Sequence, residues 1–246
     1  MLDNHVLSIS FNRAEKMNAI TRAMYGQLAD ELNNADQDFG IRAVILTSEG
    51  DHFTAGNDIY DFLEHPPTSQ DSTVAMFLAS LHNFSKPLIA AVKGNAVGVG
   101  STMLLHCDLV YAGDNAAFSM PFVNLGLCPE AASSLLAVHL MGYQRAAEAL
   151  LMGEPFMVET ALELGLISRV LPPSEVHAYA QSQAQKMARK PLSSLLETKR
   201  LMKAARTPAV LAQMDEEAQV FSRMLKEPAA IEAFNAFMEK RKPVFS

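Results

Sequence analysis

Two glycine-containing loops could supply backbone N–H groups to a substrate oxygen. Residues 94–100 (GNAVGVG) follow an apolar, strand-like stretch and lead into a helical pattern. The N–H groups at a helix start are unpaired and carry partial positive charge, so they can hold a developing oxyanion. Residues 53–58 (FTAGND) also follow a buried strand pattern, and one N–H from each loop would make a two-donor hole. Taken alone, the glycines of residues 94–100 are better explained by tight packing of a helix against a strand. Residues 53–58 alone are better explained by an ordinary turn in which Asp58 caps a short helix.

Other chemistries find little support in the residue types and their spacing. The glycines of residues 94–100 do not match the dinucleotide fingerprint G-x-G-x-x-G, and no Lys-Ser/Thr pair follows them as in a P-loop. The seven histidines form neither a His-x-x-x-His pair nor a His/Cys cluster, so no metal site is expected. Ser101, Ser133 and Ser134 lack the Gly-x-Ser-x-Gly elbow of a serine hydrolase.

One acid stands at a position with two interpretations. Glu130 follows Pro129 and precedes an apolar helical pattern. Proline suits the first helical position, and a glutamate in the first turn stabilises a helix by roughly 0.3–1 kcal/mol. From the residues alone, a plain helix start is therefore the favoured interpretation, and a catalytic acid is the alternative.

The elements that must position these residues alternate along the first two thirds of the chain. Residues 5–11 have the alternating polarity of a half-buried strand, whereas 43–46 and 88–92 are continuously apolar, as buried parallel strands are. Short strands are expected at 109–112 and 117–119. Helices are expected from a Thr21 cap to about Phe39, over roughly 73–84 and from Met103 onward. From about residue 129 the pattern is mostly helical, with breaks at Gly153, Gly165 and the Pro172-Pro173 pair.

Length and composition restrict the class of protein. The 246 residues, 49% hydrophobic and 19% charged, suffice for one α/β domain with an appendage. The net charge of −7 argues against a general binder of nucleic acids or anionic membranes. Two cysteines, Cys107 and Cys128, are too few for a disulfide scaffold. Since neither a membrane span nor a signal peptide is visible, we expect a cytoplasmic protein, from a bacterial source, without nucleic-acid or membrane partners.

Several segments, taken in order, resemble the enoyl-CoA hydratase/isomerase (crotonase) family. They are residues 12–20 (NRAEKMNAI), 53–58, 86–100, 107–112 (CDLVYA), 117–121 (AFSMP) and the ending 236–242 (AFMEKRK). The resemblance implies an α/β fold, a crotonase-like spiral of ββα units. It also implies an acyl-CoA site in a core of residues 1–190 and a C-terminal helical region, 191–246, that builds a homotrimer or hexamer.

The resemblance also implies a set of site residues. By position, the family's two oxyanion donors fall on the backbone N–H groups of Asn57 and Val99. The residues expected to contact coenzyme A are Arg13, Lys16, Ala55, Asp58, Ile59, Phe237 and Lys240, the last two beside the adenine of a neighbouring subunit. The acyl pocket would be lined by Met76, Phe77, Met103, Phe122, Leu127 and Leu135, although such residues at helical spacing equally indicate plain core. Asp58 also suits a structural role in its loop, and residues 239–242 suit a solvated helix end. No cofactor beyond the coenzyme A part of the substrate is expected.

The carboxylates suggest which reaction of the family is catalysed. The family's hydratases use two glutamates, and alignment places Thr102 and Phe122 at those positions, which makes water addition improbable. Glu130 lies where the Δ3,Δ2-enoyl-CoA isomerases of the peroxisomal type carry their acid. The resemblance therefore favours transfer of a C2 proton to C4, which shifts the double bond of a 3-enoyl-CoA to the 2-position. An isomerase of ring-containing acyl-CoA and a non-catalytic acyl-CoA-binding protein are the alternatives.

Overall fold

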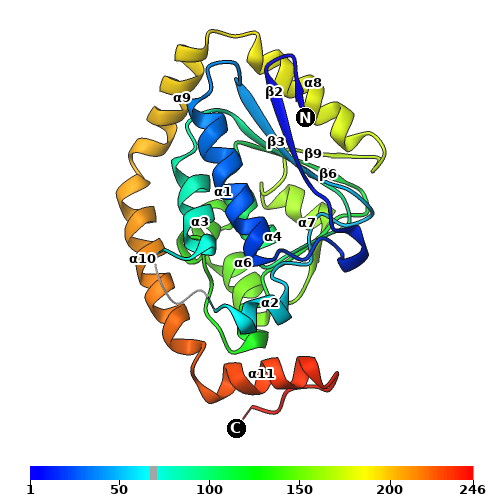
Figure 1. Cartoon of the computed structure of the whole chain (residues 1–246), viewed down its shortest axis with the longest axis vertical. Helices are drawn as coiled ribbons and strands as arrows, with labels where there is room; N and C mark the ends of the chain where they lie inside the picture. The colour runs from blue at the N-terminus through cyan, green and yellow to red at the C-terminus, as the bar shows by residue number, and fades with distance from the viewer. Residues whose placement is uncertain (67–70, 246) are drawn as a thin grey trace.

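A computed structural model describes residues 1–66 and 71–245, and its centre is a six-stranded sheet (Figure 1). The strand order is β1-β2-β3-β4-β6-β9, with β1 antiparallel to β2 and all other neighbours parallel. The bounds are β1 (Leu2–Asp3), β2 (Val6–Phe11), β3 (Ala43–Ser48), β4 (Leu88–Val92), β6 (Leu109–Gly113) and β9 (Arg169–Leu171). A smaller sheet has the order β5 (Asn95–Val97), β7 (Ala117–Ser119) and β8 (Phe156–Met157).

The two faces of the large sheet are covered by different helices. Successive side chains of a strand point to opposite faces. Val44 and Leu46 of β3 therefore join the main core with α1 (Arg22–Gln37) and α3 (Thr73–Asn83), whereas Ile45 faces α8 (Val176–Ala188). The buried side of α8 consists of small residues, Val176, Ala180, Ala184 and Ala188, which let it lie close to the strands. Burial on both faces explains why residues 43–46 of β3 and all of β4 are apolar.

The remaining helices fill the region beyond the sheet and run down one side of the molecule. In chain order they are η1 (Ala14–Lys16), α2 (Ile59–Glu64), α4 (Val99–Thr102), η2 (Met103–His106), η3 (Phe122–Leu125), α5 (Ser133–Met141), α6 (Tyr143–Ala147), η4 (Glu148–Met152), α7 (Val158–Glu163), α9 (Leu192–Ala204), α10 (Thr207–Met224) and α11 (Pro228–Met238). Figure 1 shows α9 and α10 descending along the molecule and α11 crossing its lower end near α2. Among the described residues, no helix combines the length and apolarity that crossing a membrane requires.

The longer predicted elements are confirmed, and several short ones differ. Thr21 caps α1 as expected, accepting the Met24 N–H at 3.3 Å, but α1 ends at Gln37 instead of continuing to Phe39. Residues 94–100 are not one loop, because β5 pairs with β7 and α4 begins at Val99, before the expected start at Met103. Strands β8 and β9 interrupt the part of the chain that was expected to be helical.

Candidate active site

The two loops singled out in the sequence lie directly against each other. The Thr54 N–H donates to the Asn95 carbonyl and the Val97 N–H donates to the Thr54 carbonyl, each at 3.0 Å. Gly56 has a φ of 86°, and a Cβ there would lie 2.8 Å from the carbonyl oxygen of Val97. Glycine is therefore required at this crossing, both by its conformation and by the close approach.

The crossing brings the two predicted oxyanion donors onto adjoining backbone segments. Asn57 follows Gly56. The Gly56 carbonyl accepts the Ile20 N–H and the Asp58 N–H donates to the Ile20 carbonyl, so this parallel bridge does not use the Asn57 N–H. Val99 is the first residue of α4, where an N–H has no partner inside the helix. Within residues 1–66 and 71–245, neither N–H has an acceptor. Both groups are therefore available to an external oxygen.

The segment that carries Glu130 is a strained turn, so its interpretation as the first turn of a helix is wrong. Helix α5 begins at Ser133, and the two residues before it, Ala131 and Ala132, have φ values of 60° and 54°. A non-glycine residue in this region costs of order 1–3 kcal/mol, so the surroundings must hold the turn. His106 does so by donating its Nε2–H to the Ala131 carbonyl at 2.8 Å.

Glu130 is buried and lies beside α4. Its side chain is 8% exposed, and the hydroxyl of Thr102 donates to Oε1 at 3.3 Å. Burial and, to a smaller extent, the negative charge of Glu217 raise the pKa of Glu130 to about 7, although the Thr102 hydrogen bond opposes the rise. Thr102 is on the single turn of helix that begins at Val99, so one element carries a free N–H and a contact to the acid. A carboxyl with such a pKa can both accept and return a proton near neutrality.

Tyr25 contacts one of the two loops, and nothing in the sequence distinguished it from other core positions of α1. Its phenol donates a hydrogen bond to the side-chain oxygen of Asn57. Burial raises the pKa of Tyr25 well above its usual value, and the charge of Glu130 adds to the rise. Tyr25 also lines a cavity of about 280 Å³ with a mixed wall. Ile20, Phe62 and Val74 are its apolar part, and the charged or polar part includes Arg22, Asp61, His65 and Asp71.

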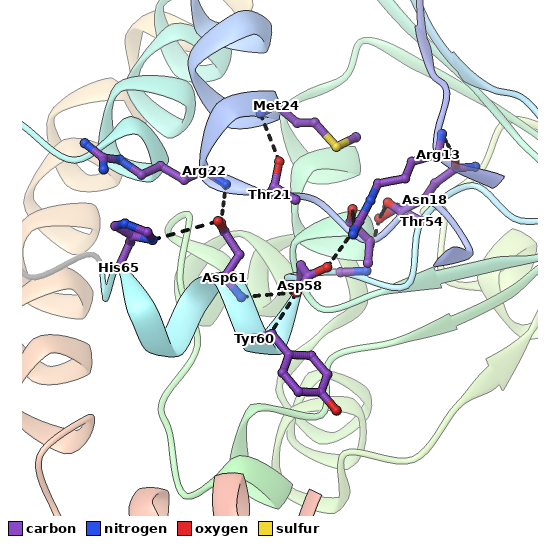
Figure 2. Close-up of polar contacts among 12 residues, drawn as sticks. Arg13, Asn18, Thr21, Arg22, Met24, Thr54, Asp58, Tyr60, Asp61 and His65 are labelled. Carbon is purple, nitrogen blue, oxygen red and sulfur yellow. Dashed lines mark hydrogen bonds and ion pairs between the residues drawn. The ribbon is translucent and has the colours of Figure 1, made fainter. Parts of the chain in front are cut away.

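Asp58 caps α2, as one interpretation of its loop predicted (Figure 2). Its Oδ1 accepts the N–H groups of Tyr60 and Asp61 at 3.1 and 3.2 Å, and its Oδ2 accepts from Arg13 Nη1 at 2.6 Å. Partial burial raises the pKa of Asp58, but the hydrogen bond and charge of Arg13 and the two amides outweigh it and lower the pKa below its usual value. The carboxylate therefore joins α2 to the segment that contains Arg13.

The residues predicted to contact coenzyme A fall into two groups. The ion pair of Arg13 with Asp58 brings the first group together: Arg13, Lys16, Ala55, Asp58 and Ile59 lie on these two joined segments. Phe237 and Lys240 form the second group, exposed at the end of α11. Their predicted contact is with a neighbouring subunit.

The predicted acyl-pocket residues are brought together only in part. Phe77, Met103, Phe122 and Leu127 are buried in the core cluster that also contains Tyr25 and Val99. The Met76 side chain is 43% exposed, and Leu135 packs against a separate small cluster with Ala132 and Val210. In the described part of the chain, no three His, Cys, Asp or Glu side chains are grouped as metal ligands would be.

Two free N–H groups on crossing loops, beside a buried carboxyl, define a site that can stabilise an oxyanion next to a proton-transfer group. The sequence model of one family, described as "Enoyl-CoA hydratase/isomerase", matches residues 2–246. The chain therefore belongs to the enoyl-CoA hydratase/isomerase family.

Similarity to individual proteins agrees with this assignment. The chain is 34% identical to a 2,3-dehydroadipyl-CoA hydratase from Escherichia coli, over 98% of the chain and 94% of the relative. It is also 34% identical to enoyl-CoA delta isomerase 2 from Rattus norvegicus, over 97% of the chain but 62% of that longer protein. The crystal structure of an enoyl-CoA hydratase/isomerase from Pseudoalteromonas atlantica superposes with a TM-score of 0.96 at 41% identity, covering 100% of this chain and 98% of the other. The predicted crotonase fold is confirmed.

Proposed function

We propose that this protein is an enoyl-CoA isomerase that converts 3-enoyl-CoA to 2-enoyl-CoA. The observation that carries the proposal is the environment of Glu130, a buried carboxyl with a pKa of about 7 beside the crossing loops. Thr102 and Phe122 occupy the positions aligned with the two glutamates of the family's hydratases, so a single carboxyl has to move the proton. An isomerase named for this chemistry is among the relatives, as is a hydratase.

The proposed reaction begins with the thioester carbonyl bound by the N–H groups of Asn57 and Val99. Glu130 removes a proton from C2, and the C–H electron pair forms a C1–C2 double bond as negative charge moves to the thioester oxygen. Each good oxyanion donor contributes roughly 3 kcal/mol of transition-state stabilisation.

Glu130 then returns the proton to C4. The electrons of the dienolate leave the oxygen, the C1–O double bond re-forms, and the C3–C4 double bond shifts to C2–C3. Neither step changes the oxidation state, so no metal or redox cofactor is required and coenzyme A serves only as part of the substrate. A base that is half ionised near neutrality suits both the removal and the return.

Water addition is the second candidate, because one relative is named a hydratase. In that reaction a water must be held and activated while a proton is delivered to the neighbouring carbon. The hydroxyl of Thr102 and the phenyl ring of Phe122 stand where the family's hydratases have carboxylates, and neither can act as a base at neutral pH. Isomerisation is therefore the better match to the residues present.

Replacing Glu130→Gln tests the proposal. The amide keeps the size of the side chain and can still accept from Thr102, but it cannot take up a proton. We expect turnover of 3-hexenoyl-CoA to fall by about 10²- to 10⁴-fold, while binding of the unreactive hexanoyl-CoA, measured by calorimetry, stays unchanged. The matched control is Glu163→Gln, at an exposed position of α7, which should leave both values as in the parent protein. Full turnover in the Glu130→Gln variant would exclude Glu130 as the base.

A further inference from the structure

A second buried carboxyl, Glu217 on α10, reaches the turn that carries Glu130. Its side chain is 5% exposed, and its Oε1 accepts hydrogen bonds from both the backbone N–H of Ser134, at 2.9 Å, and the Ser134 hydroxyl. Gln213, one turn earlier on α10, donates to the same hydroxyl at 3.0 Å. The thiol of Cys128 lies 3.7 Å from the Glu217 carbonyl oxygen, as a weak donor to it. Helix α10 therefore forms hydrogen bonds with both ends of the segment from Cys128 to Ser134.

These contacts supply the N-terminal capping acceptor that α5 lacks in its own segment. The residue in the cap position, Ala132, has a left-handed conformation and no side chain that could accept from the helix. The first N–H groups of a helix need an external acceptor, and a carboxylate is the strongest one because it also meets the positive end of the helix dipole. Glu217 gives that acceptor to the Ser134 N–H from another helix.

The capped turn is the one that orients Glu130. The Ser133 N–H donates to the Glu130 carbonyl at 2.9 Å, directly before Ser134, and Ala131 and Ala132 in between are strained. A strained turn persists only when its surroundings determine it. Glu217 and His106 hold it from opposite ends, through Ser134 and through the Ala131 carbonyl.

The charge that acts on Glu130 is negative and comes from Glu217 on α10. Burial raises the pKa of both Tyr25 on α1 and Cys128, and the charge of Glu130 adds to each rise, while the positive charge of Arg223 on α10 lowers the pKa of Cys128. Burial raises the pKa of Glu217 and the charge of Glu216 adds to the rise, whereas the side-chain and backbone hydrogen bonds of Ser134 and the backbone hydrogen bond of Ala132 lower it and favour the ionised form. Its Oε2 is buried and has no hydrogen-bond partner in the described part of the chain. A like charge nearby in a dry site makes a carboxyl hold its proton more tightly.

We propose that Glu217 is a positioning residue for Glu130: it caps α5 to fix the turn that carries Glu130, and its negative charge makes Glu130 a stronger base. This inference rests on the proposed isomerase function for its kinetic consequences. It assigns a role in the site to α10, which the sequence analysis placed in an oligomerisation region. Glu217 itself does not touch the substrate in this account and acts only through the turn and its charge.

Replacing Glu217→Gln separates the charge from the cap. The amide oxygen can still accept from Ser134, so the turn is kept, while the charge beside Glu130 is lost. In the pH profile of kcat/KM, we expect the midpoint of the acidic limb to move down by roughly one pH unit. Glu217→Ala removes the cap as well, so it should also lower the unfolding temperature and reduce kcat. The matched control is Glu216→Gln, which removes a charge from the exposed neighbouring position and should shift the midpoint far less.

An infrared titration gives a readout that does not depend on turnover. The carbonyl band of a protonated, buried carboxyl that is present in the parent protein and missing in Glu130→Gln belongs to Glu130. This band should titrate near pH 7 in the parent and at lower pH in Glu217→Gln. If the band moves but no 3-enoyl-CoA is isomerised, the proposed function fails and the inference stands. If the isomerase is active and neither the band nor the kinetic midpoint moves, the inference is wrong.

A second variant covers the case in which Glu217→Gln does not fold. Ser134→Ala keeps the carboxyl and the backbone N–H but removes one hydrogen-bond donor to Glu217. Without that donor Glu217 ionises less readily, so the Glu130 midpoint should move in the same direction by a smaller amount. An unchanged midpoint in Ser134→Ala would contradict the coupling.

Discussion

At the scale of single residues, the proposed chemistry depends on a carboxyl that is buried. In the described part of the chain, Glu130 accepts a hydrogen bond from Thr102 alone, and burial is the main reason that its pKa rises to about 7. Asp58 in the same region is the opposite case, since Arg13 and two amides hold its pKa below the usual value. A proton-transferring base needs a pKa near the working pH, whereas a capping carboxylate has to stay ionised. The environments of the two acids match these different tasks.

The raised pKa of Glu130 predicts a stability change with pH. The unfolded chain releases this proton near pH 4.5 and the folded protein near pH 7, so the folded state binds more protons between these values. Stability contributed by the neutral carboxyl is fully present below pH 4.5 and is lost as the pH rises to about 7. Glu130→Gln, which is never charged, should therefore be more stable than the parent at pH 8 by up to about 3 kcal/mol and nearly equal to it at pH 4.5.

Urea unfolding of both proteins at several pH values measures this difference, with Glu163→Gln as the exposed control. A difference that does not grow between pH 4.5 and pH 8 would show that Glu130 is not held in its neutral form.

At the scale of elements, the site depends on the crossing of the two loops. Gly100 lies within α4, and a Cβ added to it would be 2.5 Å from Cγ2 of Thr54. The Thr54 hydroxyl is also needed, because it donates to the Asn18 carbonyl at 2.7 Å and accepts the Gly56 N–H at 3.0 Å. The methyl group of Thr54 therefore lies where a side chain at position 100 would have to be placed.

Gly100→Ala should destabilise the protein by about 1–3 kcal/mol, because the added methyl overpacks this contact. Thr54→Ser deletes Cγ2 and keeps the hydroxyl, so the double variant Thr54→Ser/Gly100→Ala should recover most of the loss. The midpoints of chemical denaturation of both single variants and the double variant test this as a thermodynamic cycle. Strictly additive effects would mean that the two loops do not meet as described.

The elements also show what the sequence could and could not predict. Strands β3 and β4 were predictable because they are buried on both faces and read as apolar runs. The short strands β5 and β8 carry no such pattern, and their pairing with β7 alone defines them. The Pro129-Glu130 pair looked like a helix start because local preferences favour it there. A turn held by His106, a residue distant in sequence, overrides those preferences.

At the scale of the whole molecule, the site is assembled from separate parts of the chain. Asn57 and Val99 could be named as candidates because each lies in a segment that resembles the family, and Glu130 because it lies where the family's isomerases carry their acid. Tyr25 and Glu217 were not, since one looks like a core position of α1 and the other like any glutamate of an amphipathic helix. Their importance comes from contacts between elements, to Asn57 and to Ser134, which no local pattern records.

The surface of the single chain bears on its assembly. Large apolar side chains stay exposed on the chain alone, among them Tyr143, Leu151 and Met152. Burying them against further copies would be favourable. A homotrimer or hexamer is therefore still our prediction. Sedimentation analysis should give a mass equal to three or six chains of 26.8 kDa each. A monomer at micromolar concentration would contradict it.

The most direct test of the central claim is a spectrophotometric assay of the unmodified protein with 3-hexenoyl-CoA and, in parallel, with crotonyl-CoA. A lone Glu130 beside two N–H donors predicts conversion of 3-hexenoyl-CoA to the conjugated 2-enoyl product, without hydration of crotonyl-CoA. Efficient hydration of crotonyl-CoA would contradict the account, because neither Thr102 nor Phe122 could activate the water that this reaction consumes.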